Sequence, residues 1–377
     1  MFTLIISVIV IIKVFLLVRK ILQPCNRIRK LGDVGLFLGD PELKGVYRER
    51  QISRLTKLRR VGALPPVYPN GWYCIAESDQ LKLKSIREVT VFGQFLTLVR
   101  SESGQVYLID SYCPHLGANF NVGGKASCVT TTTFMSVAET GKCTRIPYNE
   151  GSIPQQAQVA VWPVLERNQH IYVWYHCDGK EPEWNIPEFD EILNEEWKYG
   201  SNLFNIDLDN SKHWIRHVWD GNWAPKSHDE SHVSVMYLDQ YLTIGGYKIP
   251  LTSSRLQAEQ HGPGIVHMLF DFGILGKGVV LHHVTPQEPL LQLVRFKMFS
   301  TVPSWFAKFF LIGEATQFER DVFIWSNKKY IKNPIVVRND GPIQKHRRWY
   351  SQFYSENSPR LLPNGEVSNQ VRSIYDW

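Results

Sequence analysis

The sequence predicts an α+β protein with an N-terminal transmembrane helix, a small antiparallel β domain and a larger C-terminal domain of strands and one long helix. Three observations carry this prediction: an apolar run at the start, short runs rich in branched and aromatic residues in the middle, and a helical spacing of apolar residues after further strands. We expect an anchor over residues 1–20, a basic connector over 21–65, the β domain over 66–184 and the C-terminal domain over 185–377.

The composition is that of a globular protein. Of the 377 residues, 44% are hydrophobic and 21% are charged, so the chain can bury two ordinary domain cores. The net charge of +6 comes without a long basic run interleaved with aromatic residues, which argues against a nucleic-acid partner. The six cysteines have neither the density nor the spacing of a secreted disulfide scaffold, so we expect a reducing compartment.

The first element is the membrane anchor. Residues 2–18 are apolar apart from Lys13 and two hydroxyl residues, and as a helix they would extend roughly 25 Å, near the lower limit for crossing a bilayer. One alternative is a signal peptide, which would need a basic start and a small-residue cleavage site, and another is a buried core helix. Because Arg19 and Lys20 follow directly, we expect a single-pass protein of the endoplasmic reticulum with the rest of the chain in the cytosol.

Residues 21–65 form the connector. Basic residues recur across 48–60, and glycine and proline interrupt the segment at several points. This composition is typical of a linker that lies near anionic lipid headgroups, and it carries no evident catalytic chemistry.

The middle of the chain predicts the β domain. Runs rich in branched and aromatic residues alternate with turn-forming residues, and the connections at 93–94, 103–105 and 167–169 suit hairpins. The expected strands are 89–92, 95–99, 106–110, 159–164 and 170–175.

One loop of this domain carries residues suited to metal binding. Cys113 and His115 flank Pro114, so a thiolate and an imidazole can bind metal from one stiffened loop. Two such loops, which give two thiolates to one iron and two imidazoles to the other, form a Rieske [2Fe-2S] cluster. A single pair of this kind is common by chance, so its surroundings decide the interpretation.

Those surroundings resemble a known family. The strand that ends at Asp110, the segment 138–148 and the two strand-like runs that follow are together similar to the Rieske domain of non-haem iron oxygenases, specifically the Neverland-type cholesterol 7-desaturases. The resemblance implies that Cys113 and His115 are ligands of a [2Fe-2S] cluster.

The sequence departs from the family where the second ligand pair, of the form C-x-x-H, should stand. The corresponding window, residues 131–137, reads T-T-T-F-M-S-V. Cys128 is followed three places later by Thr131, and Cys143 by Ile146, so neither begins the pair. Half a ligand set cannot hold a two-iron cluster in the family manner, and the gap lies within 125–137.

The C-terminal domain is expected to be α+β. Its predicted strands are 251–260, 264–272, 278–286 and 290–299, and its predicted helix is 307–327. We expect one stripe of this helix to pack on the sheet; its residues are Leu311, Ala315, Phe318, Val322 and Trp325.

The end of the chain resembles the same desaturase family over 318–330 and 340–354, so the resemblance covers about residues 66–377. It implies a helix-grip (START-like) fold, in which a curved sheet surrounds a long helix and encloses a deep apolar pocket. Such a pocket suits a sterol, which is a rigid apolar plate with one hydroxyl.

Oxygen activation in this family needs a second metal, a mononuclear Fe(II) held by two histidines and one carboxylate. The family places these ligands in a segment of the form N-G-x-D-x-x-H-x-x-x-H shortly after the connector between the domains. No such segment follows Trp197 here, and the break falls near Gly200 and Ser201.

One local pair could substitute. His228 and His232 stand four residues apart with Asp229 and Glu230 between them and Asp220 upstream, a spacing that could bind metal. Because the flanking residues resemble a region downstream of the family's iron segment, we expect an exposed polar turn instead.

The remaining histidine pairs make weaker candidates. His282 and His283 are adjacent, so in a strand they would point to opposite faces, and we expect neither to be a ligand. His213 and His217 also stand four apart, without further support.

The resemblance implies an enzyme of steroid hormone biosynthesis that converts cholesterol to 7-dehydrocholesterol with dioxygen and electrons from NAD(P)H. A separate reductase would deliver the electrons, and relatives usually form homotrimers. Two hypotheses remain open for this chain. Either its two gaps are errors of sequence or splicing in a desaturase, or the chain is a catalytically inactive sterol-binding isoform. A pure electron carrier fits poorly, because half of the cluster motif is missing.

Overall fold

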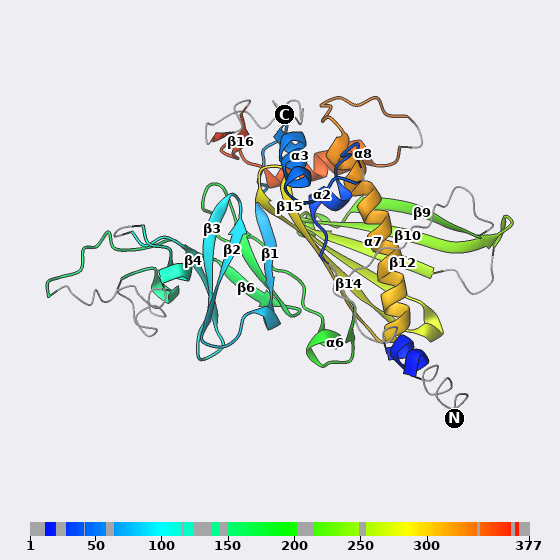
Figure 1. The fold of residues 1–377 in the computed structure, drawn as a ribbon, viewed down its shortest axis with the longest axis horizontal. Helices are drawn as coiled ribbons and strands as arrows, with labels where there is room; N and C mark the ends of the chain where they lie inside the picture. The colour runs from blue at the N-terminus through cyan, green and yellow to red at the C-terminus, as the bar shows by residue number, and fades with distance from the viewer. Residues whose placement is uncertain are drawn as a thin grey trace.

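The computed structural model describes eleven stretches of the chain: 12–19, 28–40, 42–57, 64–114, 117–123, 138–143, 150–201, 215–248, 254–337, 340–362 and 366–368. Two β-rich parts lie side by side, with β1 at their boundary (Figure 1). A long helix, α7, crosses the sheet of the larger part.

The first part contains two small antiparallel sheets. One has the strand order β1-β7-β6 and the other β2-β3-β4-β5. All five predicted runs are confirmed as strands, although the run at 159–164 is divided between two of them. The bounds are β1 (Gly71–Glu77), β2 (Ser85–Val91), β3 (Gln94–Arg100), β4 (Val106–Asp110), β5 (Val161–Trp162), β6 (Val164–Arg167) and β7 (His170–Tyr175), with short helices η1 (Ser78–Gln80) and α4 (Phe120–Gly123).

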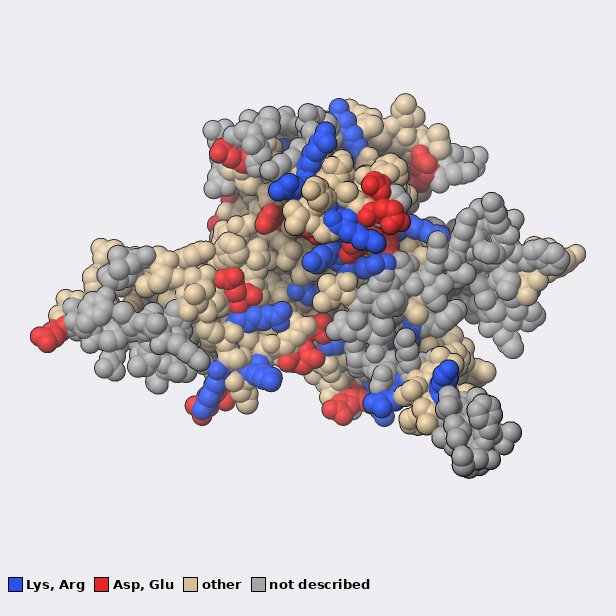
Figure 2. Space-filling view, in the orientation of Figure 1, with Lys and Arg blue, Asp and Glu red and all other residues tan. Residues whose placement is uncertain are grey.

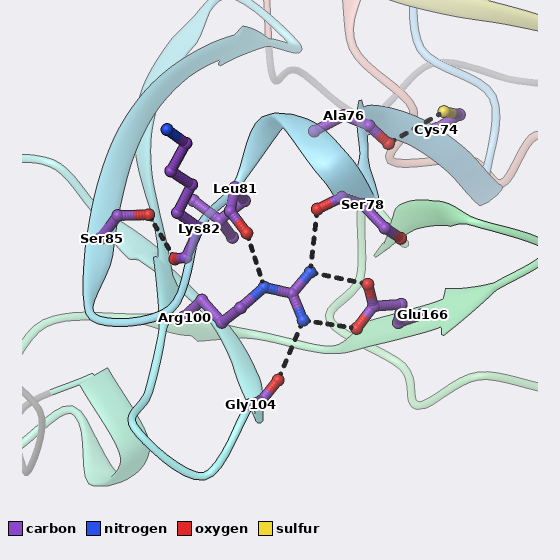
Figure 3. A network of polar contacts seen from close by, with 9 residues as sticks. All are labelled: Cys74, Ala76, Ser78, Leu81, Lys82, Ser85, Arg100, Gly104 and Glu166. Carbon is purple, nitrogen blue, oxygen red and sulfur yellow. Dashed lines mark hydrogen bonds and ion pairs between the residues drawn. The ribbon is translucent and has the colours of Figure 1, made fainter.

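Arg100 ties the two small sheets together. Its Nε donates to the main-chain oxygen of Leu81 at 2.8 Å, and one Nη donates to that of Gly104 at 3.0 Å. Its guanidinium also binds both carboxylate oxygens of Glu166, at 2.7 and 3.0 Å (Figure 3). Because Arg100 lies at the end of β3 and Glu166 in β6, this paired contact fixes one sheet against the other.

The second part is built on an eight-stranded antiparallel sheet. Its order is β11-β10-β12-β13-β14-β15-β8, and β9 pairs with the free side of β10. All four predicted strands are confirmed. The bounds are β8 (Lys198–Ser201), β9 (Ile215–Pro225), β10 (Val233–Ile244), β11 (Tyr247–Lys248), β12 (Ser254–His261), β13 (Ile265–Asp271), β14 (Lys277–Glu288) and β15 (Leu291–Ser300), with short helices α6 (Asp190–Leu193), η2 (His228–Glu230) and η3 (Gly273–Leu275).

Helix α7 (Ser304–Asn327) packs on one face of this sheet. This packing agrees with the expected helix-grip fold, in which a curved sheet surrounds a long helix. Leu311 is 1% exposed and Ala315 is fully buried, and Phe318 packs against the same apolar cluster. The predicted stripe is wrong at its end, since Trp325 is 51% exposed. The last turn instead meets the N-terminal region, where Asn327 donates to the main-chain oxygen of Gly35 at 3.1 Å.

The N-terminal region lies against α7. Helices α2 (Leu31–Val34) and α3 (Gly45–Lys57) occupy the expected connector, and Arg29 pairs with Glu319 of α7 at 3.1 Å. On the face displayed in Figure 2, Lys and Arg interleave with Asp and Glu, densely over α2 and α3. Residues 12–19 are helical, whereas 2–11 lie outside the described residues. In the part of the chain that is described, no helix is both long and apolar enough to cross a membrane.

The C-terminal segment returns to the first part. Helix α8 (Ile343–Tyr350) leads through η4 (Ser351–Phe353) to the short pair β16 (Arg360–Leu361) and β17 (Val367–Ser368). The amide of Asn70 donates to the main-chain oxygen of Phe353 at 2.6 Å, and that of Val67 to Pro359 at 2.9 Å. The segment that contains Phe353 and Pro359 therefore lies against the start of β1.

Candidate functional site

The predicted metal loop directly follows β4. Cys113 donates its amide to the main-chain oxygen of Ala118 at 2.9 Å, and Gly117 donates to that of Cys113 at 2.9 Å. Gly117 has a φ of +73°, a conformation that glycine adopts without strain. The Cys113 side chain is partly exposed. His115 lies outside the described residues.

A second turn supports Cys143 near this loop. Its amide donates to the main-chain oxygen of Ala157 at 2.8 Å, and Cys143 is also partly exposed. Ala138 and Cys113 pack in the same apolar cluster, so the two turns lie close together. Cys128 and the window 125–137 lie outside the described residues.

The histidine content of this part decides whether the residues present fit a Rieske cluster. Between residues 71 and 163 the sequence contains one histidine, His115, whereas the cluster needs two imidazoles on one iron. The nearest histidine beyond, His170, is fully buried at the boundary with the second part. The ligand set of this chain therefore does not fit the cluster.

The predicted break in the second part falls at the edge of the large sheet. Strand β8 ends at Ser201, which pairs with Met298 of β15, and 202–214 lie outside the described residues. His213 is among them, and the side chain of His217 is likewise not described. No described histidine pair takes the place of the missing segment.

His228 and His232 are not brought together around a metal. His228 belongs to η2 and is exposed, whereas the ring of His232 stacks on Trp184 with centroids 4.7 Å apart. Neither belongs to a described group of side chains whose ligand atoms converge. The polar turn expected from the sequence is therefore observed at His228, while His232 is half-buried by its aromatic neighbour.

Carboxylates are nevertheless present on α7. Burial raises the pKa of Glu314 and of Asp321 above their ordinary values, and neither has a cationic partner among the described residues. An uncompensated carboxylate on the helix that packs inside the sheet can accept a cation. The sequence did not single out either residue.

An open cavity of about 510 Å³ lies between β9, β10 and the segment that leads into α8. Its volume is typical of small-molecule sites. The lining mixes apolar residues with charged ones: Trp223, Met236, Lys328, Pro334, Ile335, Val336, Asp340, Pro342, Ile343, His346 and Arg347.

His282 and His283 point to opposite faces of β14, as predicted. The ring of His282 stacks on Phe296 at 4.1 Å and meets Phe318 of α7 at 5.5 Å. His283 faces the first part instead, where its Nε2 lies 2.9 Å from the hydroxyl of Tyr172. The two histidines thus belong to different environments.

The sequence analysis missed one convergent group. Cys74, His170 and His283 are fully buried, and their ligand atoms lie within 4.8 Å of one another. They come from β1, β7 and β14, which are far apart in the sequence. No spacing in the sequence could have indicated this group, because only the packing of the two parts brings it together.

Comparisons with known proteins agree with the fold. Residues 71–163 match the Rieske [2Fe-2S] domain, and residues 173–354 match the 3-ketosteroid 9alpha-hydroxylase C-terminal domain. The solved structure of dicamba monooxygenase with non-heme iron and dicamba covers 76% of this chain and 97% of its own, with a TM-score of 0.51 and 15% identity. At that identity the likeness concerns the fold alone.

Two curated relatives are much closer in sequence. The cholesterol 7-desaturase of Caenorhabditis elegans is 55% identical, over 99% of this chain and 97% of its own. The cholesterol 7-desaturase nvd of Xenopus laevis is 39% identical, over 91% of this chain and 83% of its own. The first alignment spans 414 positions and this chain has 377 residues, so at least 37 positions have no counterpart here.

Proposed function

This chain belongs to the cholesterol 7-desaturase family of Rieske oxygenases, and from that premise we propose that its complete form removes hydrogen from C7 and C8 of cholesterol. The observation that carries this proposal is 55% identity to a cholesterol 7-desaturase across nearly the whole of both chains. Identity of this extent leaves little room for another reaction, because it includes the domain that encloses the substrate as well as the one that accepts electrons.

The proposed substrate suits the second part of the molecule. Helix α7 and the large sheet enclose an apolar cluster that includes Phe270, Phe296, Met298 and Leu311. A substrate site lined by such residues would accept a flat apolar molecule by hydrophobic burial, whereas a charged substrate would lose its solvation without compensation. A sterol is therefore the substrate class that we propose.

We propose that the complete form holds a [2Fe-2S] cluster and a mononuclear Fe(II), with electrons supplied from NAD(P)H by a separate reductase. Cys113 and His115 would provide one half of the cluster ligands. Asp321 or Glu314, whose pKa burial raises, would provide the carboxylate for the second iron. The remaining ligands are absent from this sequence, so no catalytic step is assigned to the chain itself.

We further propose that the missing positions fall at the two breaks, one within 125–137 and the other near Gly200 and Ser201. An interruption at these places would remove ligands and leave the strands on either side intact. The intact pairing of β8 with β15 up to Ser201 agrees with this, since the sheet edge forms without the segment that should follow.

Membrane attachment and assembly belong to the same proposal. Residues 12–19 are helical, and the large apolar side chains among them are between 46% and 63% exposed. We propose that residues 1–20 anchor the protein in the endoplasmic reticulum, that 21–65 connect the anchor to the β domain (66–184) and the catalytic domain (185–377), and that the complete form is a homotrimer. An anchor would keep the enzyme at the bilayer in which its substrate dissolves.

A restored chain tests the function directly. We would insert the segments of the Caenorhabditis elegans relative at the two breaks and express this extended chain beside the 377-residue chain, each with NADPH, a reductase and cholesterol. The extended chain should form 7-dehydrocholesterol and the shorter chain should not. An extended chain that binds iron at both sites and leaves cholesterol unchanged would contradict the proposal.

A second candidate function is supported by the single histidine between residues 71 and 163. A chain with this ligand set could serve as a sterol-binding isoform that does not turn substrate over. Peptide mass spectrometry of the tissue protein across 124–137 and 196–205 distinguishes the two. Peptides that match this sequence support the isoform, and peptides that contain extra residues show that the sequence is incomplete.

A further inference from the structure

The convergent group of Cys74, His170 and His283 lies where the two β-rich parts meet. Cys74 belongs to β1, His170 to β7 and His283 to β14, and each side chain is fully buried. Their ligand atoms lie within 4.8 Å of one another. A thiol and two imidazoles are costly to bury without partners, so their convergence calls for a physical reason.

The hydrogen bonds of His170 leave one nitrogen free. Its Nδ1 lies 2.8 Å from the main-chain oxygen of Asn168, and a carbonyl oxygen can only accept, so Nδ1 carries the proton. With the proton on Nδ1, Nε2 keeps its lone pair. Nε2 is buried and has no partner. Metal-binding histidines are commonly oriented in this way, by a bond from the other ring nitrogen.

His283 repeats this arrangement with the nitrogens exchanged. Its Nε2 lies 2.9 Å from the hydroxyl of Tyr172, and its buried Nδ1 has no partner. When Nε2 donates to the tyrosine oxygen, Nδ1 presents a lone pair. Tyr172 is itself fully buried and therefore holds the ring in place.

Cys74 supplies the sulfur. Its thiol makes only a long contact of 3.7 Å to the main-chain oxygen of Ala76 (Figure 3). Burial raises the pKa of this thiol to about 11, although Arg295 and Lys297 act in the opposite direction. The free thiol is therefore protonated, and a metal that binds it would displace the proton into solvent.

We propose that Cys74, His170 and His283 bind one zinc-class transition-metal dication, which joins the β domain to the sheet of the C-terminal domain. One thiolate with two imidazoles is a donor set that Zn²⁺ and Co²⁺ accept, and alkaline-earth cations do not. His267 lies close enough to His283 to influence it electrostatically, and its two buried nitrogens also lack partners.

This site is separate from both iron sites of the family. Cys113 belongs to the turn after β4, in a different apolar cluster from Cys74. His283 points away from α7, whereas its neighbour His282 points toward that helix. The metal would therefore lie on the face of the large sheet that points away from α7. It would link three strands that are far apart in the sequence.

Metal substitution in the full-length chain tests the proposal. The chain would be purified in detergent, stripped with a chelator and titrated with Co²⁺, with thiolate-to-cobalt charge-transfer absorption and bound metal per chain as readouts. We expect one tightly bound metal and a thiolate band. His283→Asn should abolish the band and weaken zinc binding by more than about 100-fold, since loss of a residue that merely orients a ligand costs roughly 10–100-fold.

His282→Asn is the matched control, because His282 is the adjacent, partly buried histidine on the opposite face of β14. It should keep the band and the affinity. Cys113→Ser should also keep both, which separates this site from the predicted Rieske loop. The proposal would be overturned if His282→Asn and His283→Asn reduced the thiolate band and the zinc affinity equally. It would also be overturned if Cys113→Ser reduced either of them.

A measurement without substitution at the site guards against variants that fail to fold. Zinc X-ray absorption of the Cys113→Ser chain should show one sulfur and two or three nitrogen or oxygen neighbours. A coordination shell without sulfur, or with several sulfurs, would overturn the assignment, as would failure to bind zinc at all. If the chain does not bind zinc, water would form hydrogen bonds with the free nitrogens of His170 and His283 instead.

Discussion

Arg100 is the residue on which the packing of the first domain depends most directly. It donates to three main-chain oxygens, those of Leu81, Gly104 and Ser78, and to both carboxylate oxygens of Glu166, and its own side chain is 11% exposed. Replacement by alanine would leave these acceptors partly buried and unpaired. We expect Arg100→Ala to lower the free energy of unfolding by about 2–3 kcal/mol, measured by urea denaturation.

Arg87→Ala is the comparison. Arg87 lies on the neighbouring strand β2 and makes one exposed hydrogen bond, to Gln80 at 2.6 Å. Its loss should change the unfolding free energy by less than about 0.5 kcal/mol. If the two variants unfold at the same urea concentration, the network around Arg100 does not hold the sheets together.

The same contact predicts a dependence on pH. Burial alone would raise the pKa of Glu166, but the hydrogen bonds from Arg100 and its charge outweigh it, so the pKa lies below its ordinary value of 4.5. The unfolded chain then binds the proton more readily than the folded chain. The contribution of the Arg100–Glu166 contact to stability is therefore full above pH 4.5 and is lost as the pH falls through the pKa of Glu166 in the folded chain.

We therefore expect the stability difference between the parent and Arg100→Gln to narrow as the pH falls below 4.5. Urea unfolding curves at several pH values would measure it, with Arg87→Gln as the reference substitution. A difference that stays constant from pH 7 down to pH 3 would show that Glu166 does not titrate with the contact.

At the scale of elements, the sequence predicted those strands whose residues alternate or form branched runs between turns. It did not predict β1, because Gly71–Glu77 is buried along almost its whole length and has no alternation to detect. Strands β9 and β10 were missed for another reason. In β9, His217 and Asp220 were considered only as metal ligands, and the long pairing of Ile215–Pro225 with β10 becomes evident only from the register.

The candidate-site residues also divide into those that a local pattern in the sequence indicated and those that it did not. Cys113 and His115 stand in one loop, so local spacing indicated them. Cys74, His170 and His283 come from three strands, and no local pattern connects them. His282 and His283 illustrate the limit, because alternation correctly placed them on opposite faces but could not say what either face would meet.

The turn between β12 and β13 tests how the two parts fit together. A Cβ at Gly264 would lie 2.6 Å from Tyr73 of β1 and 2.7 Å from the main-chain oxygen of Val284. Because Tyr73 is buried and cannot move aside, we expect Gly264→Ala to destabilise the protein by about 1–3 kcal/mol in thermal or urea unfolding.

Gly313 provides the opposite case. It lies within α7, is exposed, and a Cβ there would have no neighbour within 4 Å. Gly313→Ala should therefore stabilise the protein by about 0.5–1 kcal/mol, since alanine restricts the unfolded chain and favours the helix. If Gly264→Ala and Gly313→Ala changed the stability alike, β1 would not pack tightly against the turn between β12 and β13.

At the scale of the whole molecule, the chain keeps the architecture of its family but lacks part of the expected ligand set. At least 37 aligned positions are missing relative to the Caenorhabditis elegans protein, yet the two small sheets, the large sheet, α7 and the boundary between the two parts form. Hydrophobic packing is spread over many residues and tolerates a missing loop. A metal centre depends on a few atoms, so the same loss removes it entirely.

This difference leads to a prediction about iron. The 377-residue chain, reconstituted with iron and sulfide and then reduced with dithionite, should show no two-iron signal in electron paramagnetic resonance, because one histidine cannot replace two on the second iron. Restoring the first missing segment alone should produce the signal and raise the unfolding temperature, since metal binding adds folding free energy. A full two-iron signal from the shorter chain would require a ligand from elsewhere, and buried His170 could reach it only if the two parts separated.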